Sequence, residues 1–205
     1  MSSEQTEASE EFPPAPAEVA DLAEASVRFV NDALGLKLDY TPETLPILDH
    51  YLRERGRGVR SEVTALIVPA AGAYFGEVVR RTVPGARWYS STGDHRSWRL
   101  EFEPFFLTFN PIGVAAEVLA EADSEDWHAH FQVLDEAREA VARALASAAE
   151  LQPEDYYTFS ARLEALHQIA DVLAALETAQ PTPRHFGPDV YRAGRGGVPP
   201  ADRPS

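Results

Sequence analysis

Three polar side chains recur at helical spacing in the segment 72–81 and could form a small binding site. Tyr74, Glu77 and Arg81 are three and four residues apart, which places them on one face of a helix. With Trp88 on the strand expected next, they would offer a ligand hydrogen-bonding groups and an aromatic ring. The simpler interpretation is a surface ion pair between Glu77 and Arg81, which contributes only about 0.3–0.5 kcal/mol. Under either interpretation, Glu77→Gln is expected to leave stability nearly unchanged.

Two glycines lie in the same helical segment, at positions 72 and 76. Each costs a helix about 1 kcal/mol relative to alanine, so each needs a physical reason. The favoured reason is close approach of another helix or of the sheet to a bare helix face, where Gly72→Ala would be milder than Gly72→Leu and could even be neutral. The alternative is a pocket between this helix and the sheet. A phosphate-binding loop is excluded, because the run has no GK[ST] and lies inside a helix.

Motifs for catalysis or metal binding are absent from the sequence. The chain has no cysteine, which excludes thiol catalysis, disulfides and zinc–thiolate sites. Its six histidines form no HExxH or HxxEH motif, and no G-x-S-x-G is present. His128 and His130 would reach one ion only if their segment were a strand or loop. We therefore predict no catalytic residue, no metal ligand and no cofactor.

The charge balance narrows the choice of partner. Thirty-three acidic residues against eighteen basic ones give a net charge of −15. Nucleic acids and anionic lipids need a positive face, so neither is expected as the main partner. Another protein, in particular a basic one, fits better. Glu101 and Glu103, which alternate with apolar residues, are predicted to add an acidic binding face.

The sequence also predicts the cellular compartment of the protein and the kind of genome that encodes it. No apolar run approaches the ~20 residues of a membrane span, and no signal-peptide pattern opens the chain. A cytoplasmic protein is therefore expected. Lys37 is the one lysine among the eighteen basic residues, a bias that indicates a GC-rich bacterial genome.

The period of hydrophobicity predicts a single α+β domain over residues 19–177. A small three-stranded antiparallel sheet is expected over Ala86–Phe109, where apolar residues alternate with polar ones. About six helices should flank it, at roughly 19–34, 42–55, 61–82, 111–122, 127–151 and 154–177. Asn110 and Pro111 supply an N-cap and a first-turn proline for the fourth of these.

Two tails are expected outside this domain. Residues 1–18 are acidic and rich in proline, and should be disordered. Residues 178–205 are rich in proline, glycine and arginine, so regular structure is not expected across most of them, although Phe186, Val190 and Tyr191 could dock locally. Removing 1–18 and 180–205 should change the free energy of unfolding by less than about 0.5 kcal/mol.

Several short runs resemble a widespread bacterial domain family of unknown function. They are LGLKLDYTPETLPILDHYL (34–52), AAGAYFGEVVRR (70–81), ARW (86–88) and FNPIGVAAEVL (109–119). The resemblance covers about residues 20–122. It implies a fold and no particular activity.

Two functions remain open. The first is a non-enzymatic protein-interaction domain of adaptor or immunity type, favoured by the lack of catalytic motifs and by the charge. The second is a small-molecule-binding domain or enzyme with a pocket between the Gly72–Gly76 helix and the sheet. A concave cleft containing Glu77 would favour the second, and a solid core with Glu77 in water would favour the first.

Overall fold

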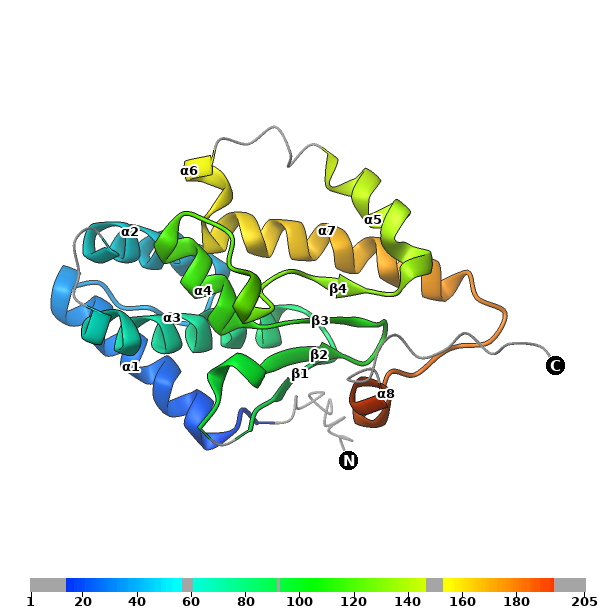
Figure 1. The fold of residues 1–205 in the computed structure, drawn as a ribbon, viewed down its shortest axis with the longest axis horizontal. Helices are drawn as coiled ribbons and strands as arrows, with labels where there is room; N and C mark the ends of the chain where they lie inside the picture. Colours follow the sequence, from blue (N-terminus) through cyan, green and yellow to red (C-terminus); the bar gives the residue numbers. More distant parts are fainter. Residues whose placement is uncertain (1–13, 57–60, 92, 147–152, 194–205) are drawn as a thin grey trace, which may run out of the picture.

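The computed structural model describes residues 14–56, 61–91, 93–146 and 153–193. It has the predicted α+β architecture, with one antiparallel sheet and helices around it (Figure 1). The helices are α1 (Ala17–Leu34), α2 (Leu45–Gly56), α3 (Ser61–Thr82), α4 (Pro111–Ala120), α5 (Arg138–Ala144), α6 (Pro153–Tyr156), α7 (Phe159–Thr178) and α8 (Pro188–Ala193). The strands are β1 (Ala86–Tyr89), β2 (Arg99–Phe102), β3 (Leu107–Phe109) and β4 (Gln132–Val133).

The sheet has four strands in the order β1-β2-β3-β4, where the sequence predicted three. Neighbouring strands pair in a register that aligns one polar row across the sheet: Arg87 opposes Glu101, Glu101 opposes Thr108, and Thr108 opposes Gln132. Because side chains alternate along a strand, this row points away from the core residues Leu100 and Leu107. We call the side of the sheet that carries this row the outer face.

The fourth strand corrects the predicted helix over 127–151. The chain forms a short 3₁₀ turn at Glu125–Trp127, then β4, and only then α5 from Arg138. Pairing of β4 with β3 gives hydrogen-bond partners to an edge that would otherwise stay open. A two-residue strand is too short to display an alternating pattern, which explains why the sequence does not reveal it. Residues 147–151 of the predicted helix lie outside the described residues.

The predicted helix over 154–177 is also divided. It consists of α6 and α7, and a separate N-cap starts the second. The Thr158 hydroxyl accepts a hydrogen bond from the Ala161 N–H at 3.1 Å. Asp49 of α2 accepts a further one from the Phe159 N–H at 2.7 Å. These caps satisfy amides that a continuous helix would have bonded internally.

Close contacts around α3 explain its glycines. A Cβ added at Gly72 would lie 2.5 Å from the Ile112 Cα of α4, and one added at Gly76 would lie 2.2 Å from the Trp88 ring. Both positions thus bring a neighbour against a bare helix face, the favoured interpretation. The clash at Gly72 involves backbone, so a neutral effect of Gly72→Ala, which the sequence left possible, does not fit this packing.

By length and composition, Val63–Thr82 within α3 is apolar enough to cross a membrane. In the folded chain 78% of its apolar window is buried inside the protein. This is the position of a core helix, and its length corrects the expectation that no apolar run approaches that of a membrane span.

The C-terminal segment is more ordered than predicted. Phe186 and Tyr191 are 5% and 4% exposed, and α8 forms around the second of them. The Tyr191 hydroxyl donates to the Phe102 carbonyl at 2.7 Å and accepts from the Leu107 N–H at 3.2 Å. The prediction that removing 180–205 leaves stability unchanged does not fit this docking. At the other end, α1 starts at Ala17, and residues 1–13 and 194–205 lie outside the described residues.

Candidate functional site

The predicted site residues on α3 lie together, but in a closed network that we call the inner network. Glu77 is 3% exposed. Its carboxylate accepts hydrogen bonds from Arg80 Nε and Nη2 at 2.8 and 2.9 Å, and from Trp88 Nε1 at 2.9 Å. Arg81 Nη2 lies 3.5 Å from the same carboxylate. Burial alone raises the pKa of Glu77, but the hydrogen bonds from Arg80 and Trp88 and the charges of the two arginines outweigh it and bring the pKa below its ordinary value.

Tyr74 and Tyr40 continue the inner network toward the surface. The Tyr74 hydroxyl accepts from the Tyr40 N–H at 2.8 Å and lies 2.6 Å from the Thr44 hydroxyl. Tyr40 has a φ of 66°, an uncommon conformation for a non-glycine residue. The Arg81 guanidinium lies 3.9 Å from the centre of the Tyr40 ring, in the geometry of a cation–π contact. The runs LDYTPETL and GAYFGEVVRR thus contact each other in the fold.

This geometry leaves no ligand space between α3 and the sheet at the glycines. Trp88 lies directly against Gly76, and α4 lies against Gly72. Glu77 is neither in a cleft nor in water: it is buried and fully hydrogen-bonded. The expectation that Glu77→Gln leaves stability unchanged therefore does not fit the structure. The predicted surface ion pair with Arg81 is secondary to the buried pair with Arg80.

The other two predicted site residues lie on the outer face. Glu101 is 2% exposed and accepts hydrogen bonds from Arg87 Nε and Nη2 at 3.2 and 2.9 Å. Its second oxygen lies 2.6 Å from Arg99 Nη2. Glu103 pairs with Arg87 from the other side. Arginines balance both carboxylates, so they do not form the free acidic face that the sequence predicted.

A pocket of about 540 Å³ opens beside this group of charges. We call it the outer pocket. The sheet contributes Arg99, Thr108 and Gln132, and the C-terminal segment contributes Tyr191, with Phe106 from the β2–β3 connection. Its volume lies within the ~300–1,000 Å³ of ordinary ligand sites.

The remaining walls of the outer pocket come from two connections between secondary-structure elements. Asp94 and Arg96 belong to the β1–β2 connection, and Asp126 and His128 to the α4–β4 connection. The Arg96 guanidinium lies 5.2 Å from the Trp127 ring centre, so the two connections contact each other.

Asn110 holds these two connections in place. Its side-chain amide donates to the carbonyls of His95 and Arg96 at 2.9 and 3.2 Å, and its backbone N–H donates to the His128 carbonyl at 2.9 Å. Its side-chain oxygen accepts from the Ile112 N–H at 2.9 Å, which is the predicted N-cap of α4. One buried asparagine therefore positions both connections and the helix that follows β3.

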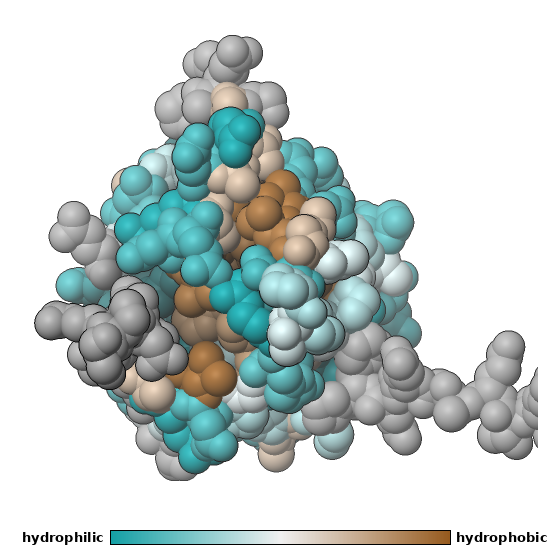
Figure 2. All heavy atoms as spheres, turned by 90° about the vertical axis from the view of Figure 1, so that its right-hand side faces the viewer, coloured by the Kyte–Doolittle hydropathy of each residue, from teal (hydrophilic) through white to brown (hydrophobic). Residues whose placement is uncertain are grey.

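A second pocket adjoins the first. It has a volume of about 400 Å³, is lined by leucines (Leu134, Leu173, Leu176) together with charged residues (Glu136, Glu177, Arg184), and shares Phe106 with the outer pocket. We call it the second pocket. Figure 2 shows hollows on the right-hand end of the molecule in which hydrophobic side chains lie between hydrophilic ones.

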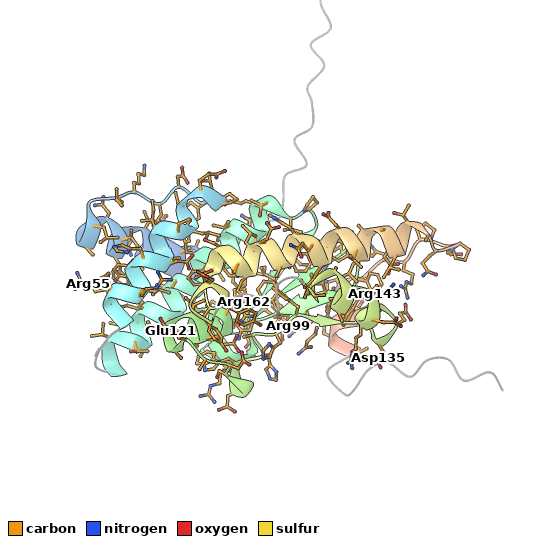
Figure 3. The ribbon with its side chains drawn as sticks, turned by 90° about the horizontal axis from the view of Figure 1, so that it is seen from above. Arg55, Arg99, Glu121, Asp135, Arg143 and Arg162 are labelled. Atoms are coloured by element: carbon orange, nitrogen blue, oxygen red, sulfur yellow. The ribbon has the colours of Figure 1, made fainter. Side chains whose placement is uncertain are left out.

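Three residues of the described part of the chain could together hold a metal ion. Ligand atoms of Glu117, Asp123 and His130 lie within 4.8 Å of one another. Glu117 is fully buried, however, and Arg162 of α7 (Figure 3) donates to its carboxylate at 2.7 Å. The Ser124 N–H occupies its other oxygen at 3.0 Å. The carboxylate most suited to an ion is thus already neutralised by an arginine.

Sequence reasoning missed the outer pocket because its residues come from four separate segments. Arg99 was visible only as the polar position in an alternating strand, and Tyr191 as an isolated aromatic residue in a predicted tail. Their meeting depends on β4 and on the docking of α8, neither of which has a periodic signal.

The fold is thus an α+β domain with an open sheet face and two adjoining pockets. Residues 2–102 match the model of a family described as "Family of unknown function (DUF6278)". The predicted resemblance to an uncharacterised family is confirmed, although this match ends before the run at 109–119. No curated protein and no solved structure matches the chain. The match includes the whole inner network, whereas much of the outer pocket lies after its last residue.

Proposed function

We propose that this chain is a non-enzymatic protein-interaction domain that holds a segment of a partner protein across the outer pocket and the second pocket. The observation that carries the proposal is the shared residue Phe106, which joins the two pockets. Two adjoining pockets suit successive side chains of a peptide better than one compact molecule.

Charge and packing support the same function. The net charge of −15 would draw a basic partner toward the domain over a long range. The outer face and the loops beside it supply hydrogen-bonding groups, and Leu134, Leu173 and Leu176 supply apolar contacts. We place this interaction in the bacterial cytoplasm.

A second candidate function is the binding of a small molecule in the outer pocket alone. The volume of about 540 Å³ and the mixture of charged, amide and aromatic groups favour it. This pocket lies on the sheet side opposite the one predicted from the glycines.

A displayed library of random peptides tests the proposal. Peptides selected on the full chain should lose binding when Leu176→Asp replaces an apolar wall of the second pocket by a charge, and also when Gln132→Trp fills part of the outer pocket with an uncharged ring. Arg143→Gln is the matched control, because Arg143 is exposed and lines neither pocket. Selected peptides whose binding neither pocket variant weakens would overturn the proposal. Failure to select any peptide, with small molecules that bind and are lost on Gln132→Trp, would favour the second candidate.

A further inference from the structure

We propose that Arg99 makes the outer pocket a subsite for a carboxylate group of the bound partner. This inference rests on the proposed function and adds to it the chemical group that the outer pocket recognises. It depends on the donors that Arg99 leaves unused, on the neighbours that share its pocket, and on the charges that surround it.

Arg99 is a cation with spare hydrogen-bonding capacity. Its Nη2 is buried and lies 2.6 Å from Glu101 Oε1 as an ion pair without hydrogen-bond geometry, so the donors left for a ligand are those of Nε and Nη1. Its guanidinium lies 3.9 Å from the centre of the Tyr89 ring, and the structure describes no hydrogen bond from its other nitrogens. A guanidinium carries five N–H donors in a planar fork, which matches a carboxylate in shape.

The neighbouring pair shows why Arg99, and not Arg87, is available. Arg87 donates twice to Glu101, pairs with Glu103 and donates to the Phe186 carbonyl at 3.3 Å. Its donors are therefore used within the fold. Glu101 keeps its two hydrogen bonds from Arg87 when a carboxylate contacts Arg99.

Other groups of the outer pocket fit a single negative charge beside an apolar body. Gln132 is exposed on the same face and offers an amide N–H₂, and Phe106 and Tyr191 lie in the same pocket. Asp94 and Asp126 also line it, and they would repel a phosphate dianion more strongly than a carboxylate. A carboxylate next to an aromatic or aliphatic group is therefore the ligand chemistry that the pocket favours.

Two sources could supply this group: the α-carboxylate at the end of a partner chain, or the side chain of an internal acidic residue. Three probes distinguish them. N-acetylphenylalanine carries an α-carboxylate, its amide carries none, and N-acetylglutamate α-amide carries a side-chain carboxylate.

Each probe would be titrated into the isotope-labelled full chain, and binding followed by NMR chemical shifts. We expect N-acetylphenylalanine or the glutamate probe to bind about tenfold or more tightly than the phenylalanine amide. This is the loss expected for hydrogen bonds to a charged group. Arg99→Gln should remove the preference, and Arg143→Gln should leave it intact. The better of the two acids identifies the source.

Equal binding of acid and amide to the wild-type chain would overturn the inference, and so would no binding by either acid. The same holds for a preference that survives Arg99→Gln. The wild-type comparison stands even where Arg99→Gln fails to fold. Failure here is distinct from failure of the proposed function: library peptides that bind the two pockets with no dependence on a carboxylate would keep the interaction domain and remove only the subsite.

Discussion

Two regions of this protein hold a buried glutamate between arginines, and they differ in how many hydrogen-bond donors of those arginines remain unused. In the inner network, Glu77 receives hydrogen bonds from Arg80 and from Trp88, and the adjoining space is filled by packed rings. On the outer face, Glu101 receives two hydrogen bonds from Arg87, while Arg99 contacts it without hydrogen-bond geometry. A pocket of about 540 Å³ opens beside the second group.

This difference indicates that the inner network stabilises the fold, whereas the arginine on the outer face is available for binding. Buried polar groups in native proteins are almost always satisfied, so an unsatisfied one needs an explanation. The inner network needs none: its charges hold α3, β1 and the segment around Tyr40 together. Arg99 places its buried Nη2 against Glu101 and keeps the donors of Nε and Nη1 beside a pocket, and a ligand is the explanation that we propose for these two nitrogens. The residues first selected from the sequence therefore divide into a structural set on α3 and a set next to the binding pocket on the sheet.

The largest effect is expected at the inner network. Glu77→Gln removes the charge that balances Arg80 inside the protein, and breaking a buried pair at one partner typically costs about 3–5 kcal/mol. Because glutamine keeps an oxygen for Trp88, we expect about 3 kcal/mol, measured by urea unfolding. A loss below about 1 kcal/mol would show that the network does not support the fold.

Acid unfolding gives a control on the same residue. The pKa of Glu77 in the folded chain lies below the ordinary value of 4.5. A lowered pKa contributes stability above the unfolded value, and this contribution is lost as the pH falls through the folded value. The glutamine variant lacks that contribution at every pH. Its stability should therefore fall less steeply than that of the wild type below about pH 4.5.

A somewhat smaller effect is expected from the helix glycines. Gly76→Ala places a Cβ 2.2 Å from the Trp88 ring, so the indole must move away from Glu77. We expect a loss of about 1–3 kcal/mol, as for overpacked cores, and a larger loss for Gly76→Leu. Gly93→Ala is a poor control because its φ is 77°, so an alanine there is strained. An unchanged melting temperature for Gly76→Ala would refute the close-packing explanation.

The docked C-terminal segment comes next. Tyr191→Phe keeps the ring and removes the hydroxyl that bonds the backbones of β2 and β3, which should cost about 1 kcal/mol. Burial raises the pKa of this hydroxyl to about 12, although hydrogen bonds from the backbone oppose the shift. It therefore stays protonated and able to donate at neutral pH. Thermal unfolding measures the loss, and the full effect of the segment follows from truncation after residue 180.

Local signals in the sequence predict much of this fold. Gly35 ends α1 in the left-handed conformation that only glycine adopts easily, and Asn110 with Pro111 starts α4. The alternation of Leu100 and Phe102 with polar residues marks β2. These features depend on a residue and its near neighbours, which a sequence displays directly.

Long-range contacts are the part that the sequence could not supply. Tyr191 contacts residues 84 and 89 positions away along the chain, and no local pattern announces such a pair. The alternation of Glu101 with core residues predicted an exposed side chain. In the structure, Arg87 from the opposite strand and Arg99 from two positions earlier on the same strand cover it. Burial of a polar strand face depends on what lies across and above it. The pairing of Tyr74 with the run around Tyr40 was equally invisible, although both runs were recognised separately.

The smallest stability effect should come from Arg99→Gln, and it is the sharpest test of the contrast between the two regions. Arg99 forms an ion pair with the buried carboxylate of Glu101, and Glu77 is itself a buried carboxylate paired with Arg80. A count of ion pairs therefore predicts similar losses of stability when either residue is replaced. The geometry predicts otherwise, because Glu101 keeps both hydrogen bonds from Arg87 when Arg99 is replaced. We expect Arg99→Gln to cost about 1 kcal/mol, because the glutamine amide can still donate to the buried Glu101 Oε1, against about 3 kcal/mol for Glu77→Gln, in parallel urea unfolding. Equal losses would mean that Arg99 is as necessary to the fold as Glu77 and that its free donors are incidental. A small loss in stability together with a lost preference for carboxylates would place Arg99 in recognition and Glu77 in the fold.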